Sequence, residues 1–405
     1  MANTGYSPRH TARPPSRPVS WSRRRRFAVA VVAAVSATVL AVLAIVSART
    51  ATGRPRPQPA AARCGTATSA GCGRASADTA GRTRSADEPA VQVPAAQVPA
   101  VWVISGARYG FQGPGAIAAA DGRVWVMNVL GDSVTELSAV TRAPISAMAA
   151  SQYGFRGPDA VAAGNGHVWI ANVPADTITE INEATGALER TVTEASGLSN
   201  PYALALSGTR LWVANAGNNS VTELNARTGL RIAVFSGARY GFDDPAALAV
   251  SPGRVWVASA AGNSITEMNA GTGAAIAVLA RGYHLTDPAA MAVAGPDLWV
   301  ASEAGASVTE IDMASGRLIR TLAGRRYGFR NPAALAVTAG RLWVANSLSN
   351  SVSEIDTRTA VLVQALEGAR YGFDNPTGLA ADGPTVWVTS LAADSVTELR
   401  LAAAG

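Results

Sequence analysis

Residues 331–368 read NPAALAVTAGRLWVANSLSNSVSEIDTRTAVLVQALEG. Glycine, asparagine, serine and aspartate divide this stretch into four short segments, ALAV, LWVAN, SVSEID and VLVQAL, which are rich in β-branched or aromatic side chains. Short apolar segments between turn-forming residues are typical of β-strands, and the stretch has no run of apolar residues at helical spacing. It therefore predicts four strands joined by tight turns.

Three residue types recur in one frame from residue 99 onward. The prolines, at steps of 43 or 44 residues, are Pro114, Pro158, Pro201, Pro245, Pro288, Pro332 and Pro376. Eleven residues after each proline comes a tryptophan: Trp125, Trp169, Trp212, Trp256, Trp299, Trp343 and Trp387. Eleven residues further comes a glutamate: Glu136, Glu180, Glu223, Glu267, Glu310, Glu354 and Glu398. Four strands at this period are one propeller blade, so the sequence predicts an all-β, seven-bladed β-propeller over residues 99–405.

The two ends of the repeat region predict how the ring closes. The last repeat stops after SVTELRLAAAG and lacks a fourth strand, whereas AVWVIS at residues 100–105 precedes the first proline. We expect this N-terminal strand to complete the seventh blade, which leaves no open sheet edge at the junction. Trp102 is then expected to be a core residue of that blade.

Charge is unevenly distributed along the chain, whose formal net charge is +6. Residues 1–98 hold 14 Arg and 3 acidic residues, whereas residues 99–405 hold 20 Arg and 25 acidic residues. A mildly acidic propeller is poorly suited to a phosphate backbone, so the sequence disfavours nucleic acid as a partner.

The N-terminal segment has the pattern of a membrane anchor. Four arginines precede an uncharged run at residues 27–48, which as a helix would span a hydrocarbon core of about 30 Å. We expect a basic cytoplasmic tail at 1–26, a transmembrane signal anchor at 27–48, and a propeller on the extracytoplasmic side of the cell membrane. Two alternatives stay open: cleavage after Ala48, which would give a secreted protein, and a twin-arginine signal.

Residues 49–98 are rich in Pro, Ala, Arg, Thr and Ser and show no strand or helix periodicity. They are predicted to be a disordered linker. Both cysteines, Cys64 and Cys72, lie in this linker, where they form either a small disulfide loop or two free thiols. Two cysteines without a neighbouring histidine are too few for a metal site.

Several motifs carry a resemblance to known propellers. WVAN at 212–215 and 343–346, WIAN at 169–172 and NSVSEIDTRT at 350–359 resemble YVTN-type repeats. The pattern P-x-x-(I/L)-A-V-x-x-x-x-(L/V)-W-V is similar to NHL-type propellers and virginiamycin B lyases. The resemblance covers about 305 of the 405 residues. It implies the propeller fold, and it says little about function because such propellers serve many purposes.

A residue that recurs in every blade is most simply part of the scaffold. In a hairpin of the second and third strands, Trp125 would lie opposite Glu136, with Arg123 diagonally across on the same face. Four blades have this arginine: Arg123, Arg210, Arg254 and Arg341. In the fifth blade Asp297 takes the arginine position and faces Glu310 with like charge, so either an acidic spot or a raised carboxyl pKa is expected there.

The candidate ligand surface is the top face, which carries the turns between second and third strands and the connections from one blade to the next. A ring of strand-end residues is predicted near its axis: Asn128, Asn172, Asn215, Ser259, Ser302, Asn346 and Ser390. Most of these residues are expected to be turn caps, since Asn and Ser close turns through their own side chains, but they are also the best available ligand surface. Glu303 and His284 complete the candidate ligand-binding set.

The sequence leaves two function classes open. Virginiamycin B lyases use His and Glu side chains with a divalent metal on the top face, so the resemblance implies a metal-dependent lyase or hydrolase as the alternative. Here His167 lies in the bottom half and is not expected to meet His284, and no triad of catalytic residues can be assembled. We therefore expect a monomeric binding or scaffolding module for a protein or envelope glycan, without cofactor, metal or catalytic residues.

The motif Tyr-Gly-Phe ends three residues before the proline in five repeats, with Phe111, Phe155, Phe242, Phe329 and Phe373. The other two repeats read Ser-Gly-Leu at 196–198 and Tyr-His-Leu at 283–285. The third position is predicted to plug the gap between blades, and the middle position to need a positive φ. The tyrosine position, which alone tolerates serine, is expected to be the least buried.

Overall fold

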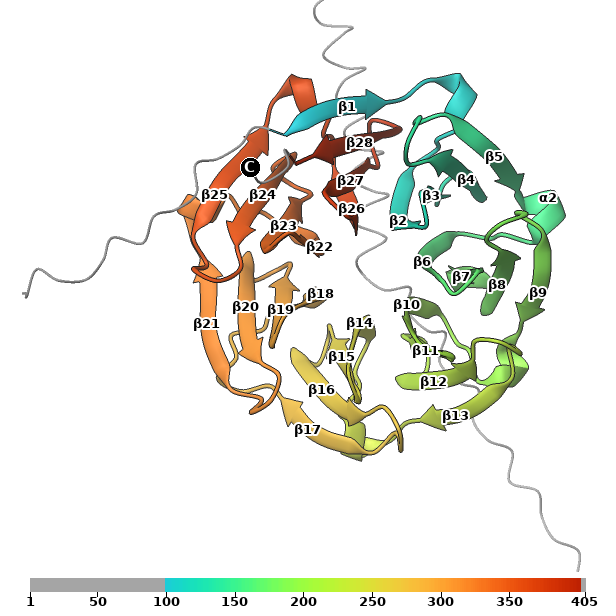
Figure 1. Cartoon of the computed structure of the whole chain (residues 1–405). Coiled ribbons are helices and arrows are strands. Elements are labelled where there is room, and N and C mark those ends of the chain that lie inside the picture. Colours follow the sequence, from blue (N-terminus) through green and yellow to red (C-terminus); the bar gives the residue numbers. More distant parts are fainter. Residues whose placement is uncertain (1–98, 402–405) are drawn as a thin grey trace, which may run out of the picture. The chain divides into compact units, whose positions relative to one another are not determined.

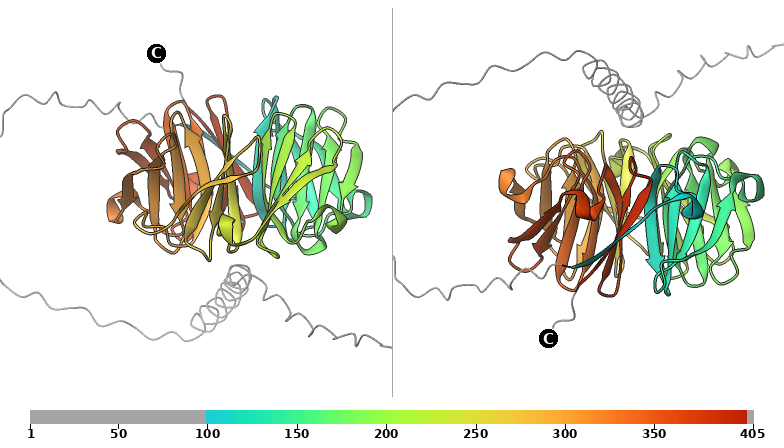
Figure 2. Two further views of the ribbon diagram at one scale, coloured as in Figure 1. Left: turned by 90° about the horizontal axis from the view of Figure 1, so that it is seen from below. Right: turned by 90° about the horizontal axis from the view of Figure 1, so that it is seen from above.

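The computed structural model describes residues 99–401, which form seven four-stranded antiparallel sheets around a central axis (Figure 1). The sheets are the blades of a propeller, numbered here from the sheet that begins with β2. Figure 2 shows the ring from the side, with the strands running between its two faces. The predicted all-β, seven-bladed fold is confirmed.

Each position in the blade repeats with nearly constant length. The innermost strands all begin at the recurrent proline: β2 (Pro114–Ala120), β6 (Pro158–Gly164), β10 (Pro201–Ser207), β14 (Pro245–Ser251), β18 (Pro288–Ala294), β22 (Pro332–Thr338) and β26 (Pro376–Asp382). The second strands are β3 (Arg123–Asn128), β7 (His167–Asn172), β11 (Arg210–Asn215), β15 (Arg254–Ser259), β19 (Asp297–Ser302), β23 (Arg341–Asn346) and β27 (Thr385–Ser390). The third strands are β4 (Ser133–Ser138), β8 (Thr177–Asn182), β12 (Ser220–Asn225), β16 (Ser264–Asn269), β20 (Ser307–Asp312), β24 (Ser351–Asp356) and β28 (Ser395–Arg400).

The outer strands follow the same repeat. They are β5 (Pro144–Ala149), β9 (Leu188–Val192), β13 (Arg231–Phe235), β17 (Ala275–Leu279), β21 (Leu318–Ala323), β25 (Leu362–Glu367) and, for blade 7, β1 (Ala100–Ile104). Short helical segments lie mainly in the connections between blades: η1 (Ala107–Tyr109), α2 (Ala150–Tyr153), η2 (Val173–Ala175), η3 (Glu194–Ser196), η4 (Ala238–Tyr240), η5 (Arg325–Tyr327) and η6 (Ala369–Tyr371). Of these, η2 alone forms the tip of a blade.

The N-terminal strand closes the ring as predicted. β1 pairs with β28 from Ala100 opposite Arg400 to Ile104 opposite Val396, so both ends of the propeller leave from the bottom face. The expectation that Trp102 is a core residue is wrong, because its side chain is 37% exposed. It lies on the outermost strand, on the sheet face that also carries Glu398 and Trp387 and that lies toward blade 1, and the Arg142 guanidinium of blade 1 is 3.8 Å from its ring centroid.

The hydrophobic core is divided among the seven junctions between blades. At each junction the second-strand tryptophan of one blade packs against aliphatic side chains of the next, as Trp125 does against Val168 and Ile170. All seven of these tryptophans are at most 1% exposed. Because the last junction joins Trp387 of blade 7 to Val124 of blade 1, the core is continuous around the ring.

The Tyr-Gly-Phe segments lie in these junctions. The third residue is buried in all seven copies, and the middle glycine has a φ between 60° and 87° in the six copies that have it. His284, which replaces that glycine, also has a positive φ of 55°. Both the predicted plug and the predicted turn geometry are therefore confirmed.

The expectation for the tyrosine of this motif is wrong. Tyr240 is 1% exposed, against 8% for Phe242, and the two rings stack with centroids 5.2 Å apart. The tyrosine hydroxyl explains this burial, because it donates to a backbone carbonyl inside the junction, as Tyr240 does to Gly273 at 3.0 Å. A polar tip that finds a partner can be buried with its ring.

The predicted segments at 1–26, 27–48 and 49–98, with Cys64 and Cys72, lie outside the described residues. Within residues 99–401, no helix has the length and apolar character needed to cross a membrane.

Neighbouring blades are latched on the top face by the tips between second and third strands. In six blades an Asp or Asn at the tip accepts a hydrogen bond from a backbone N–H of the next blade, at 2.5 to 2.9 Å. These pairs are Asp132 with Gly157, Asp176 with Asn200, Asn219 with Asp244, Asn263 with Asp287, Asn350 with Asn375, and Asp394 with Gly113. Blade 5 has Ala306 at this position, at a φ of 45° and with no side-chain acceptor.

Replacing Ala306 with asparagine is expected to raise the free energy of unfolding by about 1 kcal/mol. Asparagine tolerates the left-handed conformation better than alanine, and its amide oxygen supplies the latch to blade 6. Urea denaturation of the two proteins measures the difference. Ala304→Asn, at an exposed position on the same tip, is the control and should leave the midpoint unchanged; equal midpoints for all three proteins would contradict the latch.

Candidate functional site

A belt of seven buried glutamates runs around the ring, one on the third strand of each blade. Each lies opposite the second-strand tryptophan, as Glu136 does opposite Trp125, and each is at most 4% exposed. In four blades the predicted arginine of the second strand pairs with this glutamate: Arg123, Arg210, Arg254 and Arg341. A buried carboxylate needs such a partner, so the belt serves the scaffold.

The other three blades obtain their arginine from elsewhere. In blade 5 Arg320, on β21, has its Nε 2.7 Å from Glu310 Oε2, and in blade 2 Arg190, on β9, has its Nε 2.5 Å from Glu180 Oε2. In blade 7 the residues Arg142 and Arg400 pair with Glu398. Every glutamate of the belt is therefore paired with an arginine, including those whose second strand lacks one.

Blade 5 contains the expected pair of acids. Burial raises the pKa of Glu310 to about 7; the charge of Arg320 lowers this pKa, and the carboxylate of Asp297 raises it further. Burial and the nearby carboxylate of Asp312 raise the pKa of Asp297. The predicted rise in carboxyl pKa at this position is confirmed.

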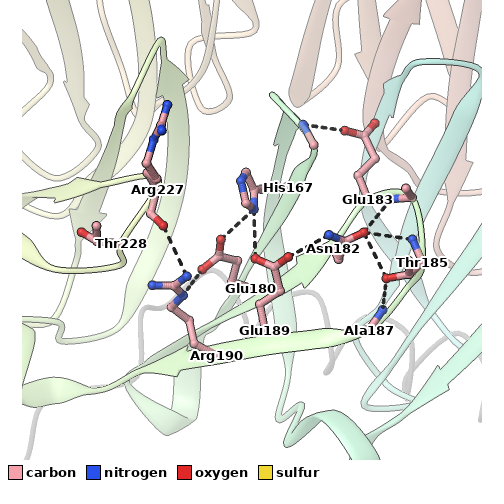
Figure 3. Close-up of polar contacts among 12 residues, drawn as sticks. His167, Glu180, Asn182, Glu183, Thr185, Ala187, Glu189, Arg190, Arg227 and Thr228 are labelled. Atoms are coloured by element: carbon pink, nitrogen blue, oxygen red, sulfur yellow. Dashed lines mark hydrogen bonds and ion pairs between the residues drawn. The ribbon is translucent and has the colours of Figure 1, made fainter.

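Blade 2 gathers a histidine and two carboxylates around one point near the bottom of the blade (Figure 3). His167 Nδ1 lies 2.8 Å from Glu180 Oε1 and 3.1 Å from Glu189 Oε2. Glu180 is fully buried, whereas the side chains of His167 and Glu189 are 25% and 24% exposed. Within residues 99–401 this is the one group of three His, Cys, Asp or Glu residues whose atoms could hold a metal ion together.

The surroundings hold these two carboxylates in place. The second oxygen of Glu180 faces Arg190, and the second oxygen of Glu189 accepts a hydrogen bond from Asn182 Nδ2 at 2.8 Å. That hydrogen bond is the main reason why the pKa of Glu189 lies below its ordinary value. Burial raises the pKa of Glu180 to about 7, although Arg190 opposes the rise.

A bulge in the outer strand brings Glu189 into this group. β9 pairs Arg190 with Glu180 and Leu188 with Ile181, so Glu189 is the extra residue between them. Blades 1, 3, 4, 5 and 6 have the same bulge with an aliphatic residue at this position: Ile145, Ile232, Ile276, Ile319 and Val363. Glu189 is not among the residues predicted from the sequence, and its departure from an aliphatic position is the sequence signal that points to it.

The predicted top-face ring lies inside the blades. Asn128, Asn172, Asn215, Ser259, Ser302, Asn346 and Ser390 are all 0% exposed. The asparagine amides bond within their own blades, as Asn128 Nδ2 does to Ser133 and Thr135 at 3.1 and 3.0 Å. The structure thus places these side chains where turn caps lie, away from the surface that a ligand would meet.

The two remaining candidates lie at the surface of the top face. His284 is exposed and lines a shallow depression of about 380 Å³ together with Asn263, Arg281 and Leu285. Glu303 is half-buried at the tip of blade 5. His167 begins β7 at the bottom of blade 2, so the two histidines lie on opposite faces, as predicted.

The comparisons with known proteins concern the fold. No family model matches the chain, and no curated protein matches it by sequence. Among solved structures, a streptogramin B lyase matches with a TM-score of 0.64 at 16% identity, over 76% of this chain and 100% of that one. A catalytically inactive virginiamycin B lyase from Staphylococcus aureus, solved with quinupristin, matches with 0.65 at 16% identity, over 75% and 99%. The WD40 repeats of RRP9 match with 0.63 at 14% identity, over 76% and 99%.

These likenesses define the class: the chain is a seven-bladed β-propeller structurally similar to virginiamycin B lyase. The predicted resemblance is confirmed for the fold. The WD40 repeats of RRP9 match this chain with nearly the same TM-score as the lyases do, so the fold by itself assigns no activity.

Proposed function

We propose that this chain is an extracytoplasmic, membrane-tethered module that binds or scaffolds a protein or an envelope glycan through anionic groups of that ligand. The contact surface in this proposal is the top face, because both ends of the propeller leave from the bottom. A tether joined to residue 99 leaves the opposite face accessible. N-terminal sequencing of the mature protein tests the tether, since a start at Met1 means a retained anchor and a start near Arg49 means a secreted protein.

The observation that carries the proposal is a set of exposed arginines held over buried tyrosine rings in four blade connections. Their guanidinium carbons lie 4.4 to 4.8 Å from the ring centroids, in the pairs Arg108 with Tyr109, Arg239 with Tyr240, Arg326 with Tyr327, and Arg370 with Tyr371. Stacking on a fixed ring restricts a guanidinium, so less entropy is lost when it binds a carboxylate or phosphate. The other three connections have Gln152, Ala195 and Gly282 there, which breaks the sevenfold symmetry of the face.

Replacing Arg239 and Arg370 together with glutamine is expected to weaken binding of an anionic ligand at least about 30-fold. Each lost charge-assisted contact removes roughly 1 kcal/mol or more. The measurement uses the immobilised full chain with three probes: an anionic polysaccharide, a neutral polysaccharide of equal length, and an acidic peptide. The first and third probes distinguish a glycan from a protein ligand.

The matched control removes the same charge from the opposite face. Arg227 and Arg358 are exposed in turns at the bottom of blades 3 and 6, and Arg227→Gln with Arg358→Gln should leave affinity unchanged. An equal loss in both double variants would mean that net charge alone matters, and the proposed top-face contact would be wrong.

A metal-dependent lyase or hydrolase is the second candidate, since the fold resembles the lyases named above. Its site would include His284, the exposed histidine of the top face. Activity of the full chain that a chelator abolishes and His284→Ala removes would favour the lyase and overturn the binding module.

A further inference from the structure

Blade 2 differs from the other blades at two positions that meet in space. His167 stands where four blades have an arginine, and Glu189 stands where five blades have isoleucine or valine. Neither residue is needed to neutralise Glu180, because Arg190 already pairs with it. Blade 5 shows this directly: Arg320 alone pairs with Glu310 there, and the bulge position is Ile319.

We propose that His167 Nδ1, Glu180 Oε1 and Glu189 Oε2 bind a divalent first-row transition-metal cation at the bottom of blade 2. The three ligand atoms all lie within 4.8 Å of one another and come from three adjacent strands of one sheet. A rigid sheet presents such a set with little reorganisation.

The buried carboxylate supports this assignment. Neither oxygen of Glu180 has a hydrogen-bond donor in good geometry among the described residues, although His167 and Arg190 are close. A second carboxylate, that of Glu189, approaches the same point. The carboxylates of Glu180 and Glu189 carry two negative charges, and Arg190 supplies one positive charge. A bound metal ion would supply further positive charge.

The outer contacts are those that a metal site needs. Asn182 donates a hydrogen bond to Glu189 Oε1, so Glu189 Oε2 faces His167. Arg190 lies beside Glu180 Oε2, so Glu180 Oε1 faces His167. Such contacts orient ligands and affect metal affinity about 10–100-fold. The partial exposure of His167 and Glu189 leaves one side of the site open for water ligands.

The donor set selects the metal class. One imidazole nitrogen and two carboxylate oxygens suit Zn²⁺ and its neighbours, with bonds of about 2.0–2.2 Å. An all-oxygen set would favour Mg²⁺ or Ca²⁺. We therefore expect Zn²⁺ and Co²⁺ to bind more tightly than Mg²⁺.

Other blades supply the test variants. In the full chain, His167→Arg and Glu189→Ile introduce the residues that neighbouring blades have at these positions, so both proteins should fold. Zn²⁺ titration by calorimetry should show one ion per chain that both variants lose, with affinity reduced at least about 100-fold, and Asn182→Ala should weaken it about 10–100-fold. A change in the visible Co²⁺ absorption bands between the wild type and His167→Arg reports whether the imidazole takes part in binding. Cys64 and Cys72 are present in every variant, so they add the same background throughout.

A transplant into blade 5 tests sufficiency. Asp297→His with Ile319→Glu places the same set around Glu310, where Arg320 takes the place of Arg190, and should add a second zinc ion per chain. Equal zinc stoichiometry and affinity in the wild type and Glu189→Ile, or no zinc binding by the wild type at millimolar concentration, would overturn the proposal. A transplant that folds without gaining an ion, while the wild type binds, would show that the three residues are not sufficient and contradict the assigned ligand set.

Discussion

Replacing Trp212 with alanine is expected to lower the free energy of unfolding by about 3–5 kcal/mol. Its side chain is 0% exposed and packs between blades 3 and 4, with Phe235 stacked at 5.8 Å between ring centroids. Its indole N–H has no hydrogen-bond partner among the described residues, so the loss comes from packing and from the cavity left behind. Chemical denaturation of the full chain, followed by circular dichroism, measures the change.

Trp102→Ala is the matched control, because it removes the same side chain from a surface. Its loss should be at most about 1 kcal/mol, the value of its stacking with Arg142. Similar losses for the two variants would mean that the junctions between blades do not carry the stability of the ring.

The fold could be predicted because each blade repeats the same local information. Proline at the start of each inner strand, tryptophan on the second and glutamate on the third fix the register seven times over, and the missing last strand predicts closure by β1. The error at Trp102 came from treating the closing strand as equivalent to a core strand. Side-chain exposure at an edge depends on what covers that edge, and the repeat pattern does not contain this information.

The candidate site was harder to predict for a physical reason. The repeat pattern predicts that Asn128 and Ser259 lie near the central axis, at the top face. In the structure their side chains are buried inside the blades. Glu189 reaches Glu180 because the outer strand bulges by one residue, and a register shift changes which face a side chain occupies. Both His284 and Glu189 depart from the repeat: His284 stands in the recurrent Tyr-Gly-Phe motif, whereas Glu189 stands at a bulge position that the strand register defines.

The stability of the ring should depend on pH through Glu310. Its pKa rises from 4.5 to about 7 in the folded protein, mainly because of burial. Between pH 4.5 and 7, the Glu310 carboxyl is therefore protonated in the folded protein and ionised in the unfolded chain. The stability associated with this proton is fully present below pH 4.5 and is lost as the pH rises through 7. The loss is at most about 3.5 kcal/mol, from roughly 1.4 kcal/mol for each unit of the pKa difference between 4.5 and about 7.

Glu310→Gln is expected to remove this part of the pH dependence, because glutamine stays neutral. The free energy of unfolding of the variant should fall less than that of the wild type between pH 4.5 and 8, as measured by urea denaturation at several pH values. Asp297→Asn should reduce the slope without abolishing it, since it removes a neighbouring carboxyl but leaves the burial unchanged. Parallel pH profiles for the wild type and Glu310→Gln would show that Glu310 is ionised throughout this range, and that Arg320 fully compensates for its burial.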